Sequence, residues 1–110
     1  MFNKGATTKI DGELVIDTGS SVSLVCCIYD KLAKNFQTPM IFPTADVFKR
    51  TIFNGVSQMN DNAEMKKFAI HYDLYTIGTF NMVTGQLTPL DPSKVSNLKE
   101  LLDTYATLSE

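Results

Sequence analysis

The sequence contains little of several residue types on which common functional sites depend. It has no tryptophan, one histidine, His71, and two cysteines, Cys26 and Cys27, which are adjacent. Neighbouring residues of a strand point to opposite faces, so these two thiols do not easily pair with each other. No further cysteine could build a disulfide framework or a cysteine-based metal site. We therefore expect a reducing, cytoplasmic setting, no cofactor and no metal.

Long apolar runs and a strong charge bias are also missing. No segment approaches the ~18 apolar residues that a membrane helix needs, and the start of the chain has no apolar stretch suited to a signal peptide. We expect no association with membranes. The formal net charge is −2, so the molecule as a whole has no electrostatic preference for nucleic acid. The middle of the chain, residues 31–72, is nevertheless mildly basic.

The composition is that of an ordinary globular domain. Hydrophobic residues make up 44% of the 110 positions and charged residues 20%, and the aromatics number seven phenylalanines and four tyrosines. We expect one domain over residues 1–110, large enough to bury a modest core. Residues 1–12 are predicted to form a flexible arm.

The first half of the chain shows patterns of strands followed by a helix. Apolar runs predict strands over 14–16 and 22–29, joined through a turn at 17–21, and a short extended segment over 36–42. Thr44 is a suitable N-cap for a helix over 45–59. Phe48, Ile52, Val56 and Met59 recur at the spacing of one helix face.

The second half predicts a hairpin and a second helix. Residues 72–80 are rich in aromatic and β-branched side chains, which favours a long strand, and 81–85 supply a turn before a short returning strand at 86–88. We expect this hairpin to be the central strand pair. Asp91-Pro92 is a helix start signal, which predicts an amphipathic helix over 92–108. The fold class predicted is α+β, with a single, mainly antiparallel sheet of four to five strands packed on two helices.

One short motif suggests catalysis. Leu14-Val15-Ile16-Asp17-Thr18-Gly19 resembles the active-site loop of aspartic proteases, which would require a homodimer of the retroviral type with Asp17 from each chain. Ile77-Gly78 could serve as the apolar-glycine signature of that family. However, no glycine-rich flap is visible, and the middle of the chain has a helical pattern. A hairpin turn over 17–20 is therefore the interpretation that we favour.

A series of short matches resembles another family. The matching residues are Ile28-Tyr29-Asp30, Phe36, Pro39, Ile41-Phe42, then Ala45, Arg50 and Phe53, the run from His71 to Phe80, and Thr84-Gly85-Gln86-Leu87. This pattern resembles the small non-structural protein of gokushovirus-type microviruses, which are single-stranded DNA phages. Residues before Val22 have no counterpart in that family. Asn81-Met82-Val83 replaces a pair of residues that is usually acidic.

The resemblance implies a phage accessory protein of the host bacterial cytoplasm, acting in single-stranded DNA replication or packaging. It would bind DNA, a host or phage replication protein, or both, and no catalytic residue is carried over. If it binds DNA, we expect phosphate contacts and base stacking on exposed rings. The residues expected to make these contacts are Lys49, Arg50, Lys66, Lys67, Tyr72 and Tyr75.

Two alternatives remain open at this point. One is the homodimeric protease described above. The other is an interaction module that docks or dimerises through the predicted helix over 92–108.

Overall fold

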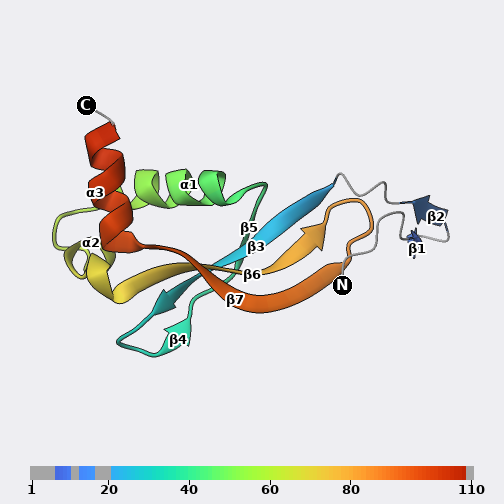
Figure 1. Ribbon diagram of the computed structural model, residues 1–110, viewed down its shortest axis with the longest axis horizontal. Helices are drawn as coiled ribbons and strands as arrows, with labels where there is room; N and C mark the ends of the chain where they lie inside the picture. The colour runs from blue at the N-terminus through green and yellow to red at the C-terminus, as the bar shows by residue number, and fades with distance from the viewer. Residues whose placement is uncertain (1–6, 11–12, 17–20, 109–110) are drawn as a thin grey trace.

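The computed structural model describes residues 7–10, 13–16 and 21–108, and its main body is one antiparallel sheet with helices (Figure 1). Five strands form the sheet in the order β4-β3-β6-β7, with β5 pairing with a second stretch of β3. The fold class predicted from the sequence is therefore confirmed. The strands are β3 (Val22–Asp30), β4 (Asn35–Phe36), β5 (Met40–Phe42), β6 (Tyr72–Asn81) and β7 (Leu87–Asn97).

The helices pack on one face of this sheet. They are α1 (Ala45–Ser57), the single turn α2 (Glu64–Lys67) and α3 (Leu98–Leu108), with a 3₁₀ turn η1 (Ala69–His71) before β6. Apolar side chains that alternate along β3 and β6 meet those of α1 and α3. Among the described residues, no helix lies on the opposite face of the sheet, and we call it the open face. The buried core residues are Cys26, Ile28, Phe48, Ile52, Val56, Ala69, Tyr72, Leu74, Leu98 and Leu101.

Local sequence signals placed several of these elements correctly. The Thr44 side chain accepts a hydrogen bond from the backbone N–H of Val47 at 3.2 Å, as an N-cap does, and α1 begins at the next residue. The long strand is also present as β6. Its turn is held by Asn81, whose side chain accepts from the N–H groups of Val83 and Thr84 at 2.9 Å. Gly85 closes the turn at φ 76°, a conformation that favours glycine.

The start of the terminal helix was predicted wrongly. Residues 92–97 continue β7 along β6, and α3 begins only at Leu98. Pro92 is tolerated because β7 is an edge strand, where a missing N–H costs no ladder hydrogen bond. The cap is instead Asn97, whose Oδ1 accepts from the N–H groups of Lys99 and Glu100 at 3.0 and 3.4 Å.

Two strand pairings also differ from the prediction. The central pair is β3 with β6, and β7 lies at the edge. The N-terminal strands β1 (Thr7–Ile10) and β2 (Glu13–Ile16) pair with each other in a separate two-stranded sheet. The expected hairpin between residues 14–16 and 22–29 is therefore wrong, and its turn at 17–20 lies outside the described residues. Among the described residues, no helix is both long and apolar enough to span a bilayer.

Candidate nucleic-acid interface

Three aromatic rings meet on the open face, and we call them the aromatic cluster. Tyr29 of β3 stands opposite Phe36 of β4, and their ring centroids lie 4.7 Å apart. Tyr75 of β6 completes the group at 6.1 Å from Tyr29 and 5.5 Å from Phe36. Phe36 is 44% exposed, so part of this surface is open to solvent. The three ring planes are inclined to one another by 56°, 81° and 75°, so the cluster presents ring edges as well as faces. An exposed ring face on a sheet is a surface on which a nucleobase can stack.

Cationic side chains surround a buried carboxylate beside the cluster. Asp73, two residues before Tyr75, is only 4% exposed and accepts a hydrogen bond from the Asn97 side-chain amide at 2.9 Å. The ammonium groups of Lys31 and Lys94 lie 3.6 and 3.7 Å from the same carboxylate oxygen. Lys94 also stands opposite Tyr75 across the β6–β7 pair. The carboxylate thus holds two half-exposed ammonium groups near the rings.

The two aromatic residues named from the sequence, Tyr72 and Tyr75, lie on opposite faces of the sheet. Tyr75 belongs to the aromatic cluster. Tyr72, which we expected on an exposed surface, is 4% exposed on the core side, and its hydroxyl lies 3.1 Å from a carboxylate oxygen of Glu64. Alternation along β6 places these two tyrosines on opposite faces because they are three residues apart. Tyr72 is therefore part of the core and cannot stack on a ligand.

The four basic residues named from the sequence lie on the helix side. Lys49 pairs with Asp46 at 3.7 Å, one turn apart on α1, and its neighbour Arg50 is exposed. Lys66 lies 3.1 Å from an Asp61 carboxylate oxygen and donates to the backbone carbonyls of Ser57 and Met59. Lys67 lies over the ring of Phe68. None of the four is among the groups that contact the aromatic cluster or Asp73.

The residues that sequence reasoning missed are Tyr29, Phe36, Lys31 and Lys94. Each of them looked ordinary in its own segment, and only strand pairing brings them together. The register Tyr29↔Phe36, Tyr29↔Asp73 and Tyr75↔Lys94 draws on four different strands. A correct prediction of the central β3–β6 pair would have revealed the cluster, because that pair aligns Tyr29 with the start of β6.

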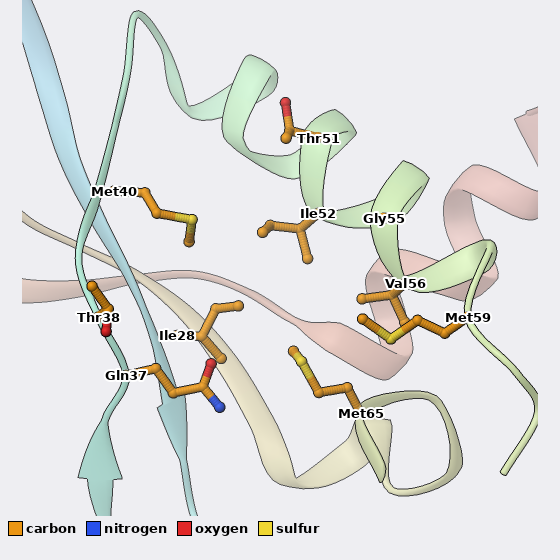
Figure 2. Close-up of a pocket in the computed structure, with 10 residues that line it drawn as sticks. All are labelled: Ile28, Gln37, Thr38, Met40, Thr51, Ile52, Gly55, Val56, Met59 and Met65. Carbon is orange, nitrogen blue, oxygen red and sulfur yellow. The ribbon is translucent and has the colours of Figure 1, made fainter. Parts of the chain in front are cut away.

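A separate groove lies on the helix side, between α1, α2 and the β4–β5 segment (Figure 2). Its volume is about 520 Å³, and Met40, Met59 and Met65 point toward it from three different segments. A Cβ added to Gly55 would meet no atom within 4 Å, so the groove is open along α1. Methionine side chains adapt to many shapes, and apolar cavities of this size are typical of ligand or side-chain binding.

The described residues offer little for catalysis. They contain no cluster of three or more His, Cys, Asp or Glu arranged to hold a metal ion. Burial, and secondarily the neighbouring Cys27, raises the pKa of the Cys26 thiol to about 11, which makes it a poor nucleophile. The glycine at position 78 is explained by packing, because a Cβ there would lie 2.7 Å from the carbonyl oxygen of Thr88. Asp17, Thr18 and Gly19, the protease-like motif, lie outside the described residues.

The comparisons with known proteins assign a family. A protein-family model described as "Phage ORF5 protein" matches residues 23–101, which includes β3 through the first turn of α3. No curated protein and no solved structure matches the chain. The matched segment contains the whole aromatic cluster and leaves the β1–β2 hairpin outside. Since the match covers well over half of the sequence, the chain belongs to the phage ORF5 protein family.

Proposed function

We propose that this phage protein is a non-structural accessory factor that binds single-stranded DNA through the aromatic cluster, and that it acts in replication or packaging. The observation that carries the proposal is the group formed by Tyr29, Phe36 and Tyr75 on a sheet face without a helix. Stacking of a base on an aromatic ring contributes about 1–3 kcal/mol and does not depend strongly on sequence.

The shape of the surface favours single strands over a duplex. Bases in a duplex are stacked on one another and present only their edges in the grooves. An unpaired strand can instead place its bases on the rings while its phosphates approach the ammonium groups of Lys31 and Lys94. Lys34, in the turn between β3 and β4, adds a third exposed cation at the same end of the sheet.

Local charge has to carry the attraction, because the net charge of the chain is −2. Asp73 neutralises part of the charge on the two lysines that it contacts. We therefore expect modest affinity that falls steeply with salt. The helix-side cations Lys49, Arg50 and Lys67 could contact the phosphates of a longer strand that wraps around the edge of the domain.

Fluorescence anisotropy with a labelled oligothymidylate at low salt tests the proposal. Phe36→Ala should weaken binding about tenfold through loss of one stacked base. Phe68→Ala is the matched control, because Phe68 is 43% exposed but its ring lies near Lys67 and His71 and not in the aromatic cluster. Lys94→Ala should also weaken binding, whereas Lys99→Ala, which removes an α3 lysine paired with Asp103, should not.

Two results would reject direct DNA binding. One is undetectable binding at low salt, and the other is equal loss of affinity in Phe36→Ala and Phe68→Ala. In either case the accessory role would have to operate through a replication protein. Affinity chromatography against the purified phage initiator would then compare the same pair of variants.

A further inference from the structure

An uncharged surface occupies the other end of the open face, and we call it the apolar half. It comprises Val25, Ile41, Phe80, Leu87 and Pro89, which the strand register places on one face: Ile41 is opposite Val25, and Phe80 is opposite Leu87. Ile41 is 47% exposed and Leu87 63% exposed. Exposed apolar side chains that gather on one face mark an interaction site more often than scattered ones do.

Two hollows deepen this surface. One, of about 300 Å³, is lined by Val25, Pro39, Ile77, Gly78, Leu87, Thr88 and Pro89. The other, of about 390 Å³, is lined by Ser23, Ile41, Phe42, Pro43, Phe80 and Met82. Neither lining contains a charged side chain, so phosphate is not the ligand that this surface fits. The surface instead fits the apolar side chains of a protein segment.

The β1–β2 hairpin forms a two-stranded sheet of its own. Its strands pair Thr7 with Ile16 through Ile10 with Glu13, and neither strand joins the main sheet. A two-stranded hairpin alone is marginally stable in water, and it needs a further layer to persist. The sequence of β2 contains three consecutive apolar residues, Leu14-Val15-Ile16, which supply the chemistry that an uncharged surface would bind.

The position of the hairpin points to a second copy of the chain. It lies beyond the Val22 end of β3, which is also the end of the sheet that carries the apolar half, and it extends away from the sheet (Figure 1). The molecule is correspondingly elongated, with extents of 51 × 33 × 23 Å. In a dimer with two-fold symmetry, the hairpin of each copy can lie on the apolar half of the other, so the same contact is made twice.

We propose that the protein dimerises by hairpin exchange, in which the β1–β2 hairpin of one copy lies over the apolar half of the open face of its partner. The aromatic cluster, at the opposite end of the same face, stays free in this arrangement. The dimer therefore does not depend on DNA binding. The family match over residues 23–101 includes the strands of the open face and leaves the hairpin outside.

Sedimentation equilibrium of the full chain, without DNA, is the first test. We expect a dimer whose dissociation constant rises about tenfold or more in Leu87→Asp, which places a charge on the face, and in Val15→Asp, which places one in the hairpin. Leu108→Asp is the control, because Leu108 is 75% exposed at the end of α3, away from both surfaces. Circular dichroism checks that each variant keeps its fold.

A mixing experiment then separates exchange from other modes of association. Each single variant has both contacts damaged in its own homodimer. A mixed dimer of Leu87→Asp with Val15→Asp contains one intact contact, between the native hairpin of the first and the native face of the second. The equimolar mixture should therefore dimerise about tenfold more tightly than either variant alone.

Three outcomes would overturn the proposal. A chain that is monomeric at all accessible concentrations would leave no dimer to explain. A dimer whose dissociation constant is unchanged by Val15→Asp would form by a face-to-face contact without the hairpin. A mixture no tighter than its components would mean that the hairpin covers the face of its own chain.

Discussion

Gly55 and Gly78 are the same residue type in opposite surroundings. Gly55 lies within α1, where an added Cβ would meet no atom within 4 Å. Gly78 lies where β6 passes β7, and there an added Cβ would be 2.7 Å from the backbone oxygen of Thr88. Gly55 is therefore a helix position with open space beside it, whereas Gly78 is required for the close approach of two strands.

These surroundings predict opposite effects of the same substitution. Gly55→Ala should raise the free energy of unfolding by about 1 kcal/mol, because alanine favours a helix and no neighbour must move. Gly78→Ala should lower it by about 2 kcal/mol, because β6 and β7 would have to separate. Urea denaturation of both variants measures the difference. Equal effects of the two substitutions would contradict this account of the β6–β7 contact.

Cys26 and Tyr72 predict a loss of stability in alkali. Burial raises the pKa of the Cys26 thiol from 9.0 to about 11, and burial with the hydrogen bond to Glu64 raises the pKa of Tyr72 above 10.0. Because both pKa values are higher in the folded state, the unfolded chain releases these protons first as pH rises. Stability should be fully present below pH 9 and should fall between about pH 9 and 11.

Urea titrations at a series of pH values, under reducing conditions, test this dependence. Cys26→Ala is less stable at neutral pH because it leaves a small cavity, but its stability should decline less steeply in alkali than that of the native chain. Cys27 lies 2.7 Å from the carbonyl oxygen of Gln37 on the other face and remains in both proteins. If the free energies of unfolding of the two proteins fall in parallel as pH rises, Cys26 does not contribute to the decline.

At the scale of elements, one side chain joins β7, β6 and α3. The Asn97 amide donates to the carbonyl oxygens of Ile70 and Tyr72, at 2.9 and 3.2 Å, and to the Asp73 carboxylate. Its oxygen caps α3 through the N–H groups of Lys99 and Glu100. This one residue ends the edge strand, begins the helix and holds the carboxylate beside the aromatic cluster.

Asn97→Ala should therefore lower the free energy of unfolding by more than the loss of a helix cap alone. We expect a decrease of about 3 kcal/mol in the free energy of unfolding, since a helix cap contributes about 1 kcal/mol and buried acceptors are left without a donor. Thr44→Ala removes only a cap, from α1, and should cost about 1 kcal/mol. Thermal denaturation compares the two variants. A cost for Asn97→Ala no larger than that for Thr44→Ala would mean that the amide contacts add nothing.

Sequence patterns identified the elements whose signals are local. The spacing from Phe48 to Val56 and the cap at Thr44 were sufficient for α1, and the aromatic run was sufficient for β6. Pairing partners were not predictable in this way, because they depend on contacts between distant segments. Asp91-Pro92 carried a valid helix signal, but the ladder with β6 extended the strand through it to Asn97. The candidate site was missed for the same reason, since its rings come from β3, β4 and β6.

At the scale of the whole molecule, the sheet separates two environments. The helix side contains the core, the methionine-lined groove and the four basic residues named from the sequence. The open face carries the aromatic cluster at one end and the apolar half at the other. If the hairpin occupies the apolar half, a dimer presents two aromatic clusters, and one DNA strand long enough to reach both would bind more tightly than a short one.

Salt dependence connects this arrangement to the number of phosphates bound. For single strands the logarithm of the binding constant falls with the logarithm of salt concentration at a slope of about −0.7 per phosphate neutralised. Lys94→Ala should reduce the slope by about 0.7, because Lys94 lies opposite Tyr75 in the cluster. Phe36→Ala should lower affinity at every salt concentration without changing the slope, because a ring neutralises no phosphate. A slope that changes in Phe36→Ala but not in Lys94→Ala would place the DNA elsewhere on the protein, with the helix-side cations as the next surface to test.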